Sequence, residues 1–135
     1  MHPIAVRLRA SRKRIVAETE ADLHAAIALA DKEADDTGIM ALVDFEAANG
    51  NTLSVIVGGA ETALSFRYAD DKTPRFLSRG HDTDGPPLPC SRDFTEPIQC
   101  PRSAVISRGE GIAALEEFAA SNELPASVEW EPVKR

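Results

Sequence analysis

Apolar and polar residues alternate along most of the segment from Met40 to Ser78, and this two-residue period is typical of half-buried β-strands. Turn-forming residues interrupt the alternation, so the segment divides into predicted strands at 40–47, 53–57, 64–69 and 75–78. Asn49-Gly50-Asn51 is a strong hairpin signal, because Asn and Gly tolerate a positive φ. Connections this short cannot hold the crossover that parallel neighbours need, so the pattern predicts an antiparallel meander.

Two helices are predicted, one on each side of the meander in the sequence. The first begins after Thr19 and ends at Gly38, and the second begins after Ser107 and ends at Asn122. Both starting residues are followed three positions later by an acid, as in a capping box. Apolar residues at helical spacing predict the buried faces, namely Leu23, Ala26, Ile27 and Ala30 in the first helix and Ile112, Leu115, Phe118 and Ala119 in the second.

The region between the meander and the second helix is different in kind. Residues 79–93 have almost nothing to bury and predict a long loop, which in a compact domain is either functional or mobile. A short return to the sheet at 94–98 would lie at an edge, because Pro97 has no N–H group to donate.

The ends of the chain complete a single α+β domain in which an antiparallel β-meander packs against two helices. The alternation of Ile4, Val6 and Leu8 predicts a strand or extended arm, with 15–17 as its partner. Residues 128–130 predict a last strand, and we expect Trp130 in the core, with a contact residue for a partner as the alternative. We therefore assign 1–14 to a basic N-terminal arm or edge strand, 15–131 to the domain, and 132–135 to an unanchored tail.

Charge is unevenly distributed along the chain. The net charge is −7, yet residues 1–14 carry five of the 15 bases and no acid, so the remainder holds 10 bases against 22 acids. An acidic body repels phosphate backbones and attracts basic protein surfaces, which argues against nucleic-acid binding. The alternative is that this charge only keeps the protein soluble.

The sequence gives no sign of a membrane or an export signal. No apolar run approaches the roughly 20 residues that span a bilayer, and the first residues lack an apolar signal segment. A cytoplasmic location is expected. Cys90 and Cys100 lack CxxC spacing, so we expect free thiols and neither a metal site nor a cofactor.

Enzyme motifs are missing from the sequence. There is no Gly-x-Ser-x-Gly, no His-x-Glu with Cys-x-x-Cys and no phosphate-binding loop, and the three histidines are scattered. Asp44 and Glu46 share one strand face, which permits acid–base chemistry, but no activating group lies near them in the sequence. We expect a non-enzymatic protein, with a small hydrolase the least favoured reading.

The order of elements, ending in a strand with Trp130, resembles the first-named immunity-protein family of bacterial polymorphic toxin systems. The resemblance covers about residues 15–131. It rests on Gly-Asn-Thr-Leu-Ser-Val-Ile-Val-Gly-Gly (50–59), the strand 63–68, Phe-Leu-Ser-Arg-Gly (76–80), the helix 111–118 and Leu-Pro-Ala-Ser-Val-Glu-Trp (124–130). Members of this family neutralise secreted toxins, often of the nucleic-acid deaminase class.

The resemblance implies an antidote that binds one toxin and covers its active site. Toxins that act on nucleic acid usually carry basic grooves, to which an acidic partner is drawn. Candidate contacts lie at turns and in the loop: Glu61, Asp70, Asp71, Arg79, His81, Asp82 and Asp84. Turn aspartates also have a purely structural use, which is the alternative for Asp70 and Asp71. The alternative function is an acidic adaptor for an endogenous basic protein.

Overall fold

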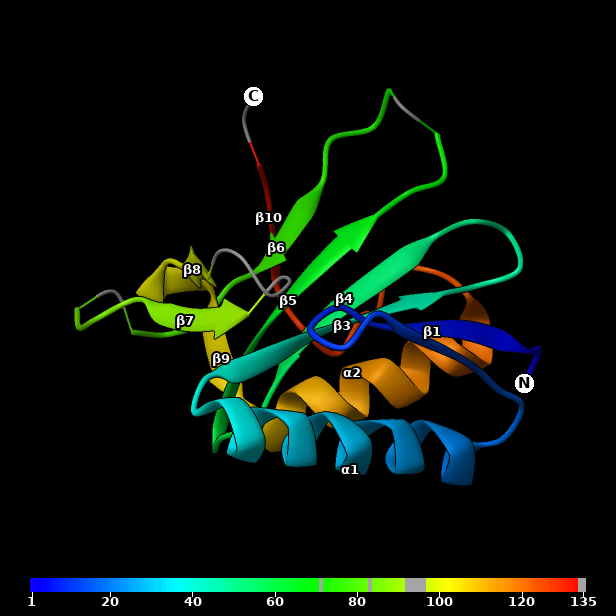
Figure 1. Cartoon of the computed structure of the whole chain (residues 1–135). Coiled ribbons are helices and arrows are strands. Elements are labelled where there is room, and N and C mark those ends of the chain that lie inside the picture. Colours follow the sequence, from blue (N-terminus) through cyan, green and yellow to red (C-terminus); the bar gives the residue numbers. More distant parts are fainter. Residues whose placement is uncertain (71, 83, 92–96, 134–135) are drawn as a thin grey trace.

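The computed structural model describes residues 1–70, 72–82, 84–91 and 97–133 (Figure 1). A 3₁₀ turn at Arg102–Ala104 precedes β9. In chain order the strands and helices are β1 Ile4–Leu8, β2 Lys13–Ala17, α1 Glu20–Thr37, β3 Met40–Glu46, β4 Thr52–Val57, β5 Glu61–Arg67, β6 Phe76–Ser78, β7 Leu88–Ser91, β8 Pro97–Cys100, β9 Val105–Ser107, α2 Arg108–Ser121 and β10 Trp130–Pro132.

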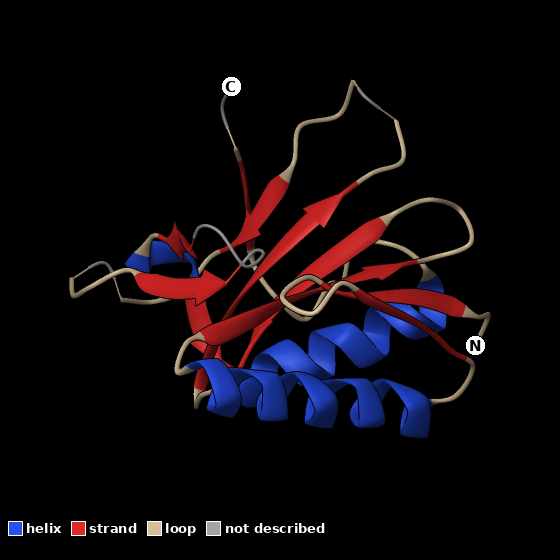
Figure 2. Cartoon of the chain, viewed as in Figure 1, coloured by secondary structure: helices blue, strands red, loops and turns tan. Residues whose placement is uncertain are grey.

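The predicted meander is present and forms the middle of a larger sheet. Strand order is β10-β6-β5-β4-β3-β1-β2, and every neighbour in this path is antiparallel. Both helices lie against the same face of the sheet (Figure 2), so the α+β class with a meander packed on two helices is confirmed.

Within the basic segment 1–14, β1 is neither an arm nor an edge strand, because it lies inside the sheet between β2 and β3, and only the last two residues of the segment belong to the edge strand β2. Ile4, Val6 and Leu8 are fully buried beneath the helices. Burial of every second residue requires a strand that lies over the core, and β2 takes the edge instead. The expected pairing with 15–17 is confirmed, with Val6 opposite Ile15.

The region expected to be a loop contains strand β7. This strand pairs in parallel with β3 and antiparallel with β8, and β8 has no other partner among the described residues, as Pro97 suggested. Leu88 and Cys90 are buried against Ile56 in a second small core on the face away from the helices. Leu88 and Cys90, separated by Pro89, are too short an apolar pattern to predict a strand. The first residues of the expected return, 94–96, lie outside the described residues.

Both helices begin and end where the capping residues predict. Thr19 and Asp22 form a complete capping box, and Gly38 closes α1 with φ 75°. At α2 only half of the box exists: Ser107 accepts from the Glu110 N–H, while the Glu110 carboxylate accepts from the Ser107 hydroxyl rather than from its backbone. Ser107 is also the last residue of β9, a strand that sequence patterns did not predict and that pairs with β5.

The buried faces of the helices are close to prediction. All four expected residues of α1 are buried, whereas in α2 Ile112 is only half-buried. Gly111 and Ala114 are buried in its place, because α2 approaches the sheet too closely for larger side chains. No helix in the described ranges is long and apolar enough to cross a membrane.

The C-terminal strand begins at Trp130, two residues later than predicted, and pairs with β6. Pro132 belongs to this strand, and the Val133 N–H donates to the Arg75 carbonyl at 2.7 Å, so the chain is anchored to residue 133 and the expected free tail at 132 is wrong. The Trp130 indole packs against the core and donates to the Pro125 carbonyl at 2.7 Å, as its predicted core position requires.

Candidate functional site

The face of the sheet that the helices leave open carries a continuous row of mostly polar side chains. Because alternate residues of each strand point into the helix-covered core, the residues between them face the other way. Cross-strand pairing brings these into one row over six strands, in the order Arg14, Arg7, Asp44, Ser54, Ser65 and Leu77.

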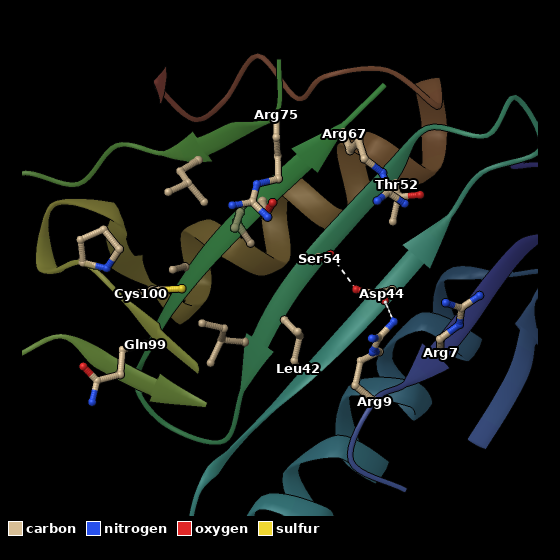
Figure 3. Close-up of a pocket in the computed structure, with 16 residues that line it drawn as sticks. Arg7, Arg9, Leu42, Asp44, Thr52, Ser54, Arg67, Arg75, Gln99 and Cys100 are labelled. Atoms are coloured by element: carbon tan, nitrogen blue, oxygen red, sulfur yellow. Dashed lines mark hydrogen bonds and ion pairs between the residues drawn. The ribbon is translucent and has the colours of Figure 1, made fainter. Parts of the chain in front are cut away.

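This open face is hollowed beside the β7–β8 hairpin (Figure 3). The hollow has a volume of about 410 Å³, and its lining includes Arg7, Arg9, Asp44, Arg67, Arg75 and Cys100. A neighbouring hollow of about 290 Å³ extends toward β2 and shares Arg7, Asp44, Thr52 and Arg67 with the first. The two therefore form one groove across the sheet, which we call the open-face groove.

Asp44 organises the middle of the open-face groove. Its carboxylate accepts from the Arg9 guanidinium at 3.2 Å and from the Ser54 hydroxyl at 2.7 Å (Figure 3). The Asp44 side chain is only 18% exposed. Asp44 and Glu46 do share this face, as predicted. The Asp44 carboxylate, however, already accepts hydrogen bonds from Arg9 and Ser54.

The open face is basic although the protein as a whole is acidic. Arg7, Arg67 and Arg75 form no ion pair within the described part of the chain. Arg12 and Arg14 line a further hollow with Arg7 and Arg9, so six arginines border this face against Asp44 and Glu46. In contrast, α1 alone carries six acids and one lysine. Positive and negative charge are thus divided between the two faces.

The predicted contacts at the β5–β6 turn have a structural use. The Asp70 carboxylate accepts from the Thr73 N–H, the Thr73 hydroxyl and the Lys72 N–H, and these bonds hold the pKa of Asp70 below its ordinary value. The side chain is exposed, but its geometry is that of a turn-stabilising aspartate. Asp71 lies outside the described residues.

The remaining predicted contacts belong to the opposite end of β5. Arg79, His81, Asp82 and Asp84 are exposed on the segment that follows β6, and the Asp82 carboxylate accepts from the Asp84 N–H at 3.2 Å. Glu61 is connected to the same segment through Arg102. Since β5 spans about 20 Å, these residues and Asp70 form two separate groups.

Glu61 is held by an ion pair. Its half-exposed carboxylate accepts from Arg102 at 2.8 Å, and Arg102 also donates to the Pro86 carbonyl at 2.8 Å. Glu61 thereby fastens the segment that carries Asp82 and Asp84 to the start of β5.

Sequence reasoning missed the arginines of the groove. Arg7 and Arg9 flank the buried Leu8, and this alternation was sufficient to place them together on one face. Arg67 and Arg75 lie on either side of the β5–β6 turn, and only the register of the sheet brings them to Arg7. Their common surface was therefore not visible from the order of residues.

The two thiols differ in environment. Cys90 is fully buried, and burial together with the neighbouring Cys100 raises the pKa of its thiol to about 12. Burial also raises the pKa of Cys100, although the Arg75 guanidinium opposes this shift. Within the described residues, no three His, Cys, Asp or Glu side chains gather as metal ligands.

Comparison with known proteins identifies the family. The model of the family described as Immunity protein Imm1 matches residues 11–132, which include every helix and all strands after β1. A search of curated proteins finds no match. The family match has nearly the same extent as the resemblance in the sequence and includes its 50–59 and 124–130 segments. The chain therefore belongs to the Imm1 family of immunity proteins.

Proposed function

We propose that this immunity protein binds one cognate bacterial toxin and neutralises it by covering the toxin's active site. The observation that carries the proposal is the family match over 11–132, since an immunity protein acts on a toxin. The toxin class we favour is a nucleic-acid deaminase, on the resemblance described above. The encounter takes place in the cytoplasm, where such a toxin finds its substrate.

The size of the domain is compatible with such a complex. A stable interface takes about 800 Å² from each partner, which is roughly a tenth of the accessible surface of 7437 Å². Occlusion needs no reactive group in the antidote, which agrees with the lack of enzyme motifs in the sequence.

We assign the initial encounter with the toxin to the exposed acidic residues in the loop after β6. Asp82 and Asp84 are exposed there beside His81, and a basic substrate groove on the toxin would attract them. Such attraction raises association rates by about 10–1000-fold at low salt. Asp70 and Glu61 are proposed as secondary contacts, because both are already engaged within the chain.

Co-expression tests the function directly. Toxins encoded beside this gene are expressed with and without the protein, and cell survival is measured. We expect rescue from one toxin and no growth defect when the protein is deleted in the absence of that toxin. Survival that is unchanged for every candidate would refute the proposal, and a defect on deletion alone would indicate the adaptor alternative.

The acidic loop has its own test. Asp82→Lys with Asp84→Lys should slow association with a catalytically inactive form of the rescued toxin by about tenfold at low salt and weaken the salt dependence. The matched control is Asp35→Lys with Asp36→Lys, which makes the same charge change on exposed positions of α1. If both variants associate at the same rate, only net charge matters and the loop assignment is wrong.

A further inference from the structure

The open-face groove has the size and composition of a binding site for a polypeptide segment. The two hollows share four lining residues and run from Cys100 on β8 to Val16 on β2. The β7–β8 hairpin borders one side through its small core with Ile56, and the β1–β2 hairpin borders the other. The strands in between are covered by no other part of the described chain.

The charges of the groove favour an anionic occupant. Arg7, Arg67 and Arg75 have no ion-pair partner among the described residues, and Arg9 is oriented by Asp44. Uncompensated guanidinium groups that line one hollow repel one another, and a carboxylate placed among them relieves this repulsion. The planar guanidinium also binds a carboxylate through two parallel hydrogen bonds, which fixes its orientation.

Other features of the groove fit a polypeptide better than a nucleic acid. Asp44 and Glu46 lie among the arginines, and a continuous row of phosphates would have to pass over both. Val16 is 62% exposed at the β2 end, and Leu42 and Leu77 contribute apolar surface at the other end. A peptide can present carboxylates, N–H donors and apolar side chains in alternation, as this surface requires.

We propose that the open-face groove binds an acidic segment of the cognate toxin, whose carboxylates are held by Arg7, Arg67 and Arg75 while Val16 packs against an adjacent apolar side chain. This inference rests on the proposed function for the identity of the partner. The complex would then use two surfaces of opposite sign, with the acidic loop meeting a basic part of the toxin and the groove meeting an acidic part. Two such contacts fix the orientation of the toxin as well as its affinity.

The groove can be tested first without the toxin. The probe is a fluorescent hexaglutamate peptide, titrated at low ionic strength against the full chain and followed by polarisation. We expect saturable binding. The double variant Arg67→Gln with Arg75→Gln should raise the Kd about tenfold, which corresponds to about 1.4 kcal/mol of binding free energy. The control, Lys32→Gln with Lys72→Gln, makes the same change in net charge on exposed positions outside the groove and should bind like the wild type.

The unmodified chain provides a second readout that does not depend on variants. Cys100 lines the groove, so the hexaglutamate peptide should slow its alkylation by a maleimide. Equal binding by the two double variants, or no protection of Cys100, would overturn the inference. So would a single-stranded oligonucleotide that binds more tightly than the peptide and loses affinity in the same groove variant.

Toxin rescue separates this inference from the proposed function. If the wild type rescues and Arg67→Gln with Arg75→Gln rescues equally, with unchanged affinity for the inactive toxin, the groove assignment is wrong but the function stands. If the wild type rescues from no toxin, the proposed function fails, and the peptide titration still decides whether the groove binds acidic chains. We expect the groove variant to lose at least about tenfold in affinity for the toxin.

Discussion

Replacing Gly111 with alanine tests the closest contact between the helices and the sheet. Gly111 is buried in the first turns of α2, and a Cβ atom at this position would lie 2.4 Å from Cγ2 of Thr62 on β5. Carbon atoms in ordinary contact are about 3.5–4.0 Å apart. The variant can therefore fold only if α2 and β5 move apart by about 1 Å.

Two opposing effects set the size of the change. Alanine is about 1 kcal/mol more favourable than glycine inside a helix. Overpacking a core costs about 1–3 kcal/mol, and Thr62 cannot turn aside, because it is 1% exposed and its hydroxyl donates to the Ile56 carbonyl at 2.6 Å. The difference between these two effects is a net cost, so we expect Gly111→Ala to lower the free energy of unfolding by up to about 2 kcal/mol, or up to about 7 °C in Tm for a domain of this length.

Urea unfolding followed through the fluorescence of the single tryptophan measures the change. Gly109→Ala is the matched control, since its Cβ would meet nothing within 4 Å and its stability should be unchanged or higher. Thr62→Ser removes Cγ2 and keeps the hydroxyl. The double variant with Gly111→Ala should therefore have a free energy of unfolding about 1–2 kcal/mol higher than the sum of the two single effects predicts. A Gly111→Ala variant as stable as Gly109→Ala would refute the close approach of the layers.

Two further predictions concern titratable groups. Hydrogen bonds from the Ser127 side chain and from the Ala126 and Ser127 N–H groups lower the pKa of Glu117 below 4.5. The ionised carboxylate therefore stabilises the fold above pH 4.5, and this stabilisation is lost as the pH falls through the lowered pKa. Glu117→Gln should therefore cost about 1 kcal/mol near neutral pH and nothing in strong acid, and a pH-independent difference in urea midpoint would contradict this origin. With a pKa of about 12, Cys90 is thiolate in only about one molecule in 10⁴ at pH 8, so native protein should react with a maleimide at Cys100 alone until it is unfolded. Equal rates for both thiols in the folded protein would contradict the burial of Cys90.

The bonds to Glu117 also hold the segment 124–130, which carried part of the resemblance in the sequence. Glu117 holds the Ala126 and Ser127 N–H groups, and Trp130 holds the Pro125 carbonyl, so the chain between α2 and β10 is fixed at both ends.

Capping and turn residues correctly predicted the elements whose ends depend on neighbouring residues in the sequence. Thr19 and Gly38 bound α1 by capping, and Asn49-Gly50-Asn51 forms the β3–β4 turn. The contact of this turn with α2 could not be predicted. The side-chain amide groups of Asn49 and Asn51 donate to the Asn122 carbonyl at the end of α2, at 3.0 and 2.9 Å. The turn thus holds the C-terminal end of α2, through bonds between residues 73 and 71 positions apart in the sequence.

Features that depend on distant pairing could not be predicted. Strands β7 and β9 have three or four residues each and are stabilised by β3 and β5, not by their own composition. The place of β1 inside the sheet depends on its pairing with β3 across α1. The groove required this register as well, because it alone places Arg7 on β1 and Arg67 on β5 in the lining of one hollow, with β3 and β4 between them.

The division of charge between the two faces has a consequence for the encounter itself. With acids concentrated on α1 and arginines on the open face, the molecule has an electric dipole directed across the sheet. In the field of a charged partner this dipole experiences a torque, so the protein rotates while it is still several ångströms away. An acidic partner therefore turns the open face toward itself before contact, and a basic partner turns the α1 face toward itself.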